Sequence, residues 1–206
     1  SNGMAKKISL TLFSFLHKDI VIIKDLKTLE IISNLRNSLI HLSKVFLAQL
    51  ARTYPKINFY DLVDGYNLLH NTNIKFSSVG SGGARFPIAS MNLLNGSKLS
   101  DLNTILKEII FTDLSLHNTV VDQVLRFKPK NVGILGLGHS ENVNYEGISH
   151  SLEIYHALKK KKIKVKINDP YVIKNNYPEL KKIPFFNFPE GLKNFDLIII
   201  INNLNE

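Results

Sequence analysis

Asn131-Val132-Gly133-Ile134-Leu135-Gly136 is a short apolar run that ends in a glycine, and it is typical of a buried strand. A helix is expected after it over residues 149–160, and further strands are expected over residues 163–168 and 196–201. Strands that alternate with helices in this way build a parallel sheet. The C-terminal part of the chain is therefore predicted to be a parallel α/β domain.

The sequence before this run indicates helices. Residues 25–51 carry apolar side chains at helical spacing, and Pro55 ends the segment because proline lacks an amide donor. The other expected helices cover residues 58–68, 92–104, 105–111 and 114–127. Residues 20–23 are expected to form a short strand, and residues 128–130 are read as a linker because domain junctions are often polar and contain proline.

The helix over residues 25–51 has an apolar stripe that needs a covering surface. Its members are Leu29, Ile32, Leu35, Leu39, Leu42, Phe46 and Leu50. Residues 105–110 and 120–125 of the same chain are one candidate cover. A second copy of the chain is the other, and the pattern alone does not decide between them.

The composition limits the chemistry that the chain can perform. Its 206 residues are 44% hydrophobic and include no cysteine, which excludes disulfides, thiolate catalysis and cysteine-ligated zinc. The seven histidines lack the paired spacing of a His-Glu-x-x-His metal site. This spacing leads us to expect no metal site. Since no apolar run reaches the roughly 18–20 residues of a membrane-spanning helix, we also expect a cytoplasmic protein with no membrane partner.

A formal net charge of +9 suggests nucleic acid as a candidate partner, because lysines that neutralise phosphates release counterions and thereby favour binding. The lysines at 159–162 close an expected helix, where cations suit the negative end of the helix dipole. Lys164 and Lys166 alternate with apolar residues, as on a strand with one solvated face. No aromatic residues interleave the basic run. We expect a basic surface rather than a specific nucleic-acid interface.

Gly80-Ser81-Gly82-Gly83-Ala84-Arg85-Phe86-Pro87 is the stretch that says most about function. Glycine lacks a Cβ atom, so residues 79–82 can fold tightly and bring backbone N–H groups close to a ligand. Such a loop can hold a phosphate or a sugar. The alternative is an ordinary surface turn, because Gly and Ser clusters mostly mark loops.

A second glycine-containing turn, Gly136-Leu137-Gly138, follows the expected first strand, and Asp169 follows a later one, as in a dinucleotide-binding fingerprint. Glu141 replaces the third glycine of that pattern, and the next helix begins only near Ser149. We therefore expect no NAD site here and interpret Asp169-Pro170 as a strand-ending turn.

Residues 82–87 look like the motif Gly-Gly-Ser-Cys-Phe-Pro-Lys-Asp, and residues 132–137, 151–154 and 168–172 are similar to a UDP-binding α/β domain. Both features resemble the UDP-glucose/GDP-mannose dehydrogenase family, which oxidises a nucleotide sugar to the uronic acid with NAD. Asn67, Asn73 and Ile74 resemble the UDP-N-acetylmannosamine dehydrogenase branch of that family.

The resemblance implies a domain organisation. Residues 25–127 would be an all-helical central dimerisation domain, with the helix over residues 25–51 as the dimer contact. Residues 128–206 would be a Rossmann-like parallel α/β domain that is shortened at its C-terminal end. Residues 1–24 would be the end of an N-terminal NAD-binding Rossmann domain, the rest of which finds no counterpart in the sequence.

The differences from the family fall on its chemistry. The family's nucleophilic Cys corresponds to Arg85, whose guanidinium stays protonated and is no nucleophile. The Lys that stabilises the oxyanion corresponds to Ser33, the Asp of Pro-Lys-Asp to Ala89, and the substrate-binding Arg of the neighbouring subunit to Asn71. The central-helix Asn is kept, as Asn37. Covalent oxidation at residue 85 is thereby excluded.

The UDP-binding part has lost charges as well. The family's Phe-Lys corresponds to His139-Ser140, and its Asp-Asp-x-Arg corresponds to Asn144-Tyr145-Glu146-Gly147. The resemblance thus implies a domain that lacks the charges with which its relatives hold a diphosphate.

We therefore expect a non-catalytic homologue of the nucleotide-sugar 6-dehydrogenases, homodimeric through its central helix, with weak nucleotide-sugar binding or a structural role. No cofactor is expected. The alternative is half of a split dehydrogenase, in which a separate NAD-binding partner docks against residues 8–23 and supplies NAD. The residues predicted to line the cleft are Asn37, Phe76, Gly80, Gly82, Gly83, Arg85 and Phe86. In that cleft the guanidinium of Arg85 is available for a carboxylate or phosphate.

Overall fold

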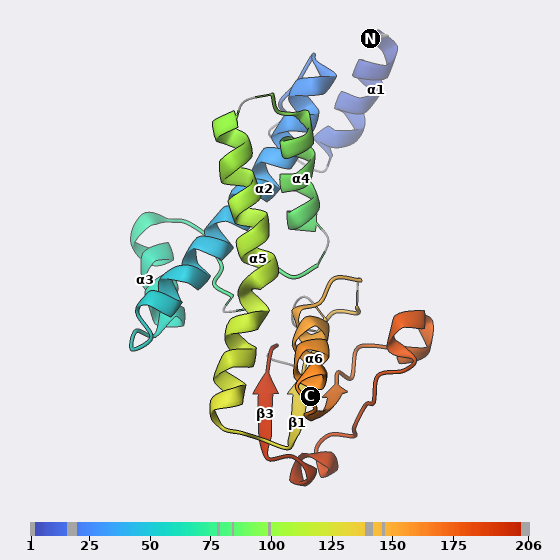
Figure 1. Cartoon of the computed structure of the whole chain (residues 1–206). Coiled ribbons are helices and arrows are strands. Elements are labelled where there is room, and N and C mark those ends of the chain that lie inside the picture. The colour runs from blue at the N-terminus through green and yellow to red at the C-terminus, as the bar shows by residue number, and fades with distance from the viewer. Residues whose placement is uncertain are drawn as a thin grey trace. The chain divides into compact units, whose positions relative to one another are not determined.

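A computed structural model of the chain describes residues 3–15, 20–77, 79–83, 85–98, 100–138, 142–145 and 147–202. It contains two compact units, Ser1–Ser33 and Asn34–Glu206. The first holds helix α1 and the start of helix α2, and the second holds the other helices and the sheet (Figure 1).

The N-terminal unit contains a helix but not the strand predicted over residues 20–23. Helix α1, Gly3–Ser14, buries none of its residues. Residues 20–25 form no regular element, so the prediction of a strand over residues 20–23 was wrong. The physical reason is that a strand needs a neighbouring strand for its backbone hydrogen bonds, and the described part of this unit offers none. Among the described residues, no helix is long and apolar enough to cross a membrane.

Helix α2, Leu26–Thr53, confirms the long helix predicted over residues 25–51. It begins where the Asp25 carboxylate accepts hydrogen bonds from the Thr28 N–H (2.8 Å) and the Thr28 hydroxyl (2.7 Å). These two bonds hold the pKa of Asp25 below its usual value. The helix ends just before Tyr54-Pro55, as expected from the missing proline donor.

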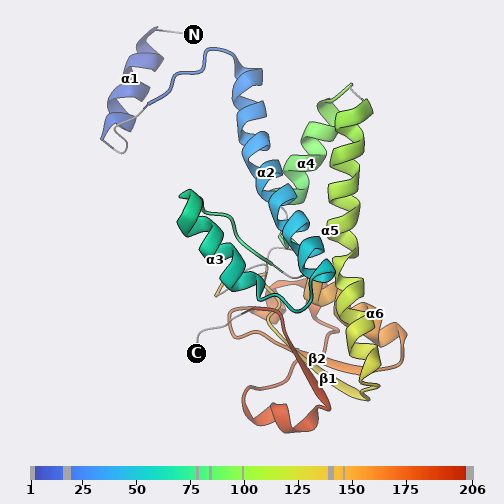
Figure 2. The same ribbon diagram turned by 90° about the vertical axis from the view of Figure 1, so that its left-hand side faces the viewer.

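Three further helices precede the sheet. Helix α3, Phe59–His70, begins where the Asn58 side chain accepts from the Tyr60 N–H, which confirms the helix predicted over residues 58–68. Helix α4, Arg85–Gly96, and helix α5, Ser100–Arg126, replace the three helices predicted over residues 92–127. They lie side by side (Figure 2). Residues 105–125 contain no Gly or Pro, so nothing interrupts α5.

The sheet has three parallel strands in the order β2-β1-β3. The elements are β1 at Asn131–Leu135, helix α6 at His150–Lys160, β2 at Lys164–Asn168, three short 3₁₀ helices (Lys174–Asn176, Pro178–Leu180, Glu190–Asn194) and β3 at Leu197–Ile200. The register pairs Ile134 of β1 with Ile167 of β2 and with Ile199 of β3. The predicted parallel α/β part is confirmed.

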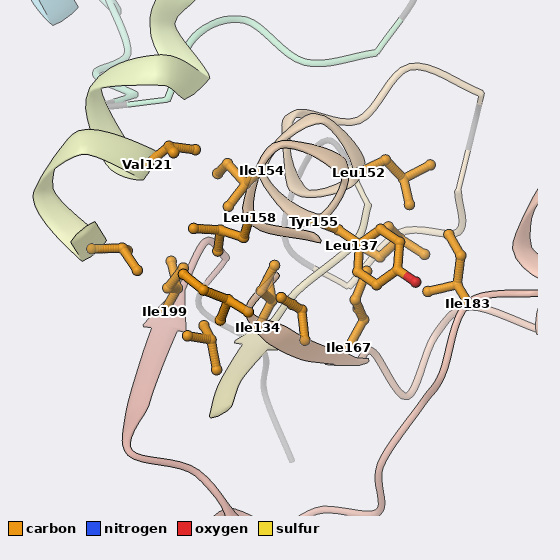
Figure 3. Packing of buried hydrophobic residues seen from close by; sticks show 14 of the residues in the cluster. Val121, Ile134, Leu137, Leu152, Ile154, Tyr155, Leu158, Ile167, Ile183 and Ile199 are labelled. Atoms are coloured by element: carbon orange, nitrogen blue, oxygen red, sulfur yellow. The ribbon is translucent and has the colours of Figure 1, made fainter. Parts of the chain in front are cut away.

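The largest core cluster lies between one face of this sheet and helix α6 (Figure 3). Alternate strand residues such as Ile134, Ile167 and Ile199 meet Ile154 and Leu158 of α6 there. Val121 of α5 belongs to the same cluster, and α5 packs along α6. The C-terminal part of α5 therefore packs into the core of the α/β segment.

Candidate functional site

The glycine loop, residues 79–83, leads into helix α4. Gly80, Gly82 and Gly83 have φ angles of +103°, +58° and +64°, a backbone region that residues with a side chain rarely adopt. All residues of the loop are buried, so it is not an exposed surface turn. Ala84, the next residue of the motif, lies outside the described residues.

A buried carboxylate on α5 holds this loop. Asp113 Oδ1 accepts from the Ser81 N–H at 2.8 Å, and Asp113 Oδ2 accepts from the Ser81 hydroxyl at 2.6 Å. The Gly83 N–H donates to the carbonyl of Ile148, just before α6, at 3.1 Å. Two of the loop's amide donors are therefore used within the fold and do not face a ligand.

Two histidines flank the same carboxylate. His41 Nε2 of α2 lies 3.2 Å from Asp113 Oδ2, close enough for an ion pair but not aligned as a hydrogen bond. His150 Nε2 of α6 lies 3.9 Å from Asp113 Oδ1. We call Ser38, His41, Ser81, Ser90, Asp113 and His150 the buried polar cluster, since all six are buried. It joins α2, the glycine loop, α4, α5 and α6.

The pKa values of the cluster reflect its burial. Burial alone would raise the pKa of Asp113, but the adjacent His41 ring and the hydrogen bonds from Ser81 outweigh it and hold this pKa below its usual value. Burial lowers the pKa of His150, and the nearby Asp113 charge opposes that shift only in part. The cluster therefore keeps Asp113 ionised near neutral pH.

Ser90, His41 and Asp113 are connected in the order of a catalytic triad. His41 Nδ1 lies 2.9 Å from Ser90 Oγ, and the tautomer of the ring decides which of the two donates. Ser90 Oγ is also 3.4 Å from Ser38 Oγ. A triad nucleophile must reach its substrate, whereas Ser90 has an exposed fraction of 0%. The chain of contacts is structural.

Cationic side chains lie next to the predicted sugar motif. Lys44 of α2 has its Nζ 5.0 Å from the ring centre of Phe86 on α4. Burial lowers the pKa of Lys44, Asp113 raises it, and Lys75 lowers it. Asn37 lies two helical turns before Lys44, on the same face of α2. Arg85 is exposed at the first position of α4.

We call Asn37, Lys44, Lys75, Arg85 and Phe86 the motif region. Sequence reasoning missed Lys44 and Lys75 because lysines on exposed helix faces and loops are common and carry no pattern. The predicted cleft residue Phe76 lies elsewhere, since its ring packs 5.5 Å from Phe59 and 5.1 Å from Tyr60. It lines a different cavity together with them.

The structure also places several of the other positions at which the sequence differs from the family that it resembles. Ala89 is buried in α4. Asn71 is the left-handed residue that ends α3, and its N–H donates to the Asn67 carbonyl. Ser33 is exposed on α2. His139, Ser140 and Glu146, and with them Glu141 of the second turn, lie outside the described residues.

The turn Gly136-Leu137-Gly138 is satisfied by the protein itself. Asp169 Oδ2 accepts from the N–H groups of Leu137 (2.7 Å) and Gly138 (3.0 Å), and Asp169 Oδ1 accepts from the Tyr171 N–H at 3.0 Å. The last bond confirms the turn predicted at Asp169-Pro170. The hydroxyls of Ser149 and Ser151 donate to carbonyls of the turn, each at 2.7 Å. The N–H groups of Leu137 and Gly138 therefore bind the Asp169 carboxylate and not a pyrophosphate.

Curated sequences that are similar to the chain include dehydrogenases of nucleotide sugars, although no protein-family model matches it. The UDP-glucose 6-dehydrogenase of Rickettsia felis is 28% identical over 193 residues, which are 87% of this chain and 43% of that protein. The enzyme of the same name from Rickettsia prowazekii is 27% identical over 200 residues, 90% of this chain and 46% of that protein.

Solved structures share the fold. A UDP-D-ManNAc dehydrogenase from Pyrococcus horikoshii has a TM-score of 0.79 at 17% identity, covering 96% of this chain and 47% of that chain. A UDP-glucose dehydrogenase from Pyrobaculum islandicum has a TM-score of 0.71 at 17% identity, and the match covers 84% of this chain and 43% of that chain. The chain spans less than half the length of the curated relatives that it matches. Over that part, sequence and fold together identify it as a relative of the UDP-glucose, GDP-mannose and UDP-N-acetylmannosamine dehydrogenases.

Proposed function

We propose that the chain is a non-catalytic relative of the nucleotide-sugar 6-dehydrogenases that binds a UDP-sugar in the motif region without oxidising it. The observation that carries this proposal is Arg85. Arg85 occupies the position of the nucleophilic Cys in the Gly-Gly-Ser-Cys-Phe-Pro-Lys-Asp motif of the dehydrogenases. It places a permanent cation at the exposed start of α4. A guanidinium cannot form the thioester, but it binds phosphate or carboxylate well.

Two other cations support binding in the same region. The Lys44 ammonium packs over Phe86 of the motif, and the charge of Lys75 lowers the pKa of Lys44. A diphosphate near them would relieve the repulsion between the two ammonium groups and the desolvation of Lys44. Asn37 adds an amide on the same face of α2.

A thermal-shift titration with UDP, UDP-glucose, UDP-N-acetylglucosamine and NAD tests this function. UDP compounds at about 100 times their Kd should stabilise the protein by about 2.7 kcal/mol, a shift of several degrees at about 2–4 °C per kcal/mol. NAD should give no shift. Lys44→Met should weaken UDP-sugar binding about tenfold or more, because a hydrogen bond to a charged group contributes about 1.5–3 kcal/mol.

The matched control is Lys107→Met, which changes an exposed lysine on α5 and should bind as the wild type does. NADH formation from UDP-glucose or UDP-N-acetylmannosamine with NAD would contradict the non-catalytic assignment. Absence of a shift with every UDP compound would contradict ligand binding and leave a structural role.

We propose in addition that α2 mediates a homodimer. Leu35, Leu39, Leu42 and Phe46 of the predicted stripe are all exposed in the single chain, so α4 and α5 do not cover them. The residues of α2 that are buried, such as His41, Val45 and Ala48, lie on another face of the helix. An exposed row of large apolar side chains on a helix marks a protein contact.

Light scattering coupled to gel filtration should therefore give twice the chain mass for the wild type. The double variant Leu39→Lys/Phe46→Lys should give a monomer, because residues with exposed fractions of 55% and 60% would bring charge into the contact. Leu68→Lys on α3, at 85% exposed, is the control and should stay dimeric. A monomeric wild type would rule out this dimer.

A second candidate function is half of a split dehydrogenase. It is favoured by α1, which exposes Ile8, Leu12 and Phe13 and buries nothing within the described residues. Co-purification of an NAD-binding protein together with restored oxidation would support it. A purified chain that binds UDP-sugars as a stable dimer and gains no oxidation with such a partner would favour the non-catalytic function.

A further inference from the structure

A cavity of about 700 Å³ lies at the C-terminal ends of α2 and α5. The start of α3 and the segment that precedes it complete its lining. Its volume is in the range of small-molecule sites, about 300–1,000 Å³. Of the residues predicted for the sugar cleft, only Phe76 lines it, so it is separate from the motif region. We call it the Arg52/Arg126 pocket.

One side of the pocket is aromatic. The Phe76 ring is held 5.5 Å from Phe59 in a tilted arrangement and 5.1 Å from Tyr60 edge to face. Phe59 is buried, which fixes the pair against the core. Ala48 and Ala51 of α2 add a small apolar floor. Rings fixed in this way offer a surface for a flat apolar group.

The pocket also contains two guanidinium groups from different helices. Arg52 is in the last turn of α2 and Arg126 is in the last turn of α5. Arg52 Nη1 donates to the neutral Gln49 Oε1 at 3.3 Å. Within the described part of the chain, no carboxylate pairs with either guanidinium, although Asp122 lines the same pocket. The lining is positively charged, and its cations are available to an anion.

A buried hydroxyl supplies a second, independent indication of a ligand. Thr119 on α5 lines the pocket, and its Oγ1 atom has almost no exposed surface and no hydrogen-bond partner among the described residues. Buried polar atoms are nearly always paired in native proteins. A polar ligand atom in the pocket would satisfy it once the Thr119 side chain rotates toward the pocket.

We propose that the Arg52/Arg126 pocket is a binding site for a small anion that carries an aromatic ring. The ring lies against Phe76 and Tyr60, the carboxylate or phosphate of the ligand binds Arg52 and Arg126, and Thr119 adds a hydrogen bond. This site goes beyond the proposed function because it shares neither the cations nor the glycine motif of the sugar site. Asp122 favours an anion of low charge over a polyphosphate, which would be repelled more strongly.

Isothermal titration calorimetry of the full chain tests the site with four probes. Phenyl phosphate and indole-3-acetate carry both a ring and an anion, and they distinguish phosphate from carboxylate ligands. Inorganic phosphate lacks the ring, and indole lacks the charge. At least one of the two aromatic anions should bind at least tenfold more tightly than both partial probes. Equal binding of all four, or no binding of either aromatic anion at millimolar concentration, would overturn the proposal.

Variants assign the binding to this pocket. Arg52→Ala/Arg126→Ala should weaken the aromatic anion at least tenfold, whereas Arg36→Ala, an exposed arginine on α2, should change nothing. Thr119→Val keeps the size of the side chain, removes the unpaired hydroxyl and should weaken binding several-fold while the protein melts no earlier than the wild type. Unchanged affinity in the double arginine variant would place the ligand elsewhere and refute the site.

Discussion

Gly80→Ala is expected to destabilise the folded chain by roughly 3 kcal/mol or more. A Cβ atom at this position would lie 2.5 Å from Asp113 Oδ1 and 2.7 Å from His150 Nε2, both far inside contact distance. The φ of +103° adds strain, because residues with a side chain rarely adopt it. Relief requires Asp113 or His150 to move, and such a movement breaks the hydrogen bonds that anchor Ser81.

Urea denaturation measures this effect, and Gly65→Ala is the matched control. Gly65 lies inside α3, and nothing within 4 Å would meet its new Cβ atom. That change should stabilise the protein by about 0.5–1 kcal/mol, because alanine is the better helix former. If Gly80→Ala were as harmless as Gly65→Ala, the glycine loop would not be packed on Asp113 as described.

The sequence predicted the regular elements well wherever local signals are strong. Helix α2 was predicted to within two residues at its C-terminal end because its apolar spacing is regular and Pro55 stops it. The strands of the sheet were predicted because short segments rich in Val and Ile, with lysines alternating in β2, lie between polar turns. Both signals depend only on neighbours in the sequence.

The region between α3 and β1 was predicted less well. Helices were predicted over residues 92–104, 105–111 and 114–127, whereas the structure has α4 and one helix α5 that continues through residues 111–114. Asp113 sits on the buried face at that point and breaks the hydrophobic pattern. In the structure this polar residue anchors the glycine loop through its bonds to Ser81.

The candidate site shows the same limit. The tight turn of the glycine loop could be predicted because glycine adopts positive φ more readily than other residues. Its burial could not, because the Asp113–Ser81 bonds join residues 32 positions apart, and His41 and Ser90 are 49 apart. Such contacts depend on how helices pack and leave no periodic trace in the sequence. One signal in the sequence could have indicated the cluster, because His41 is a polar residue among the apolar residues of the buried face of α2.

Asp113→Ala is expected to cost about 3–5 kcal/mol of stability at neutral pH, the range for a buried charged group whose partners are left behind. The Ser81 N–H and hydroxyl would lose their acceptors, and His41 would lose the carboxylate beside it. Asp122→Ala is the control on the same helix, because Asp122 is exposed, and should change stability by no more than about 0.5 kcal/mol. Chemical denaturation at pH 7 compares the two.

The pH dependence of this difference shows whether charge is the cause. The pKa of Asp113 is lower in the folded chain than the ordinary 3.8, so the unfolded chain binds its proton first as the pH falls. The stability that Asp113 contributes is therefore complete above about pH 4 and is lost as the pH falls through the lower folded value. The gap between wild type and Asp113→Ala should narrow below pH 4. A gap of constant size down to pH 2.5 would mean that Asp113 acts by shape alone.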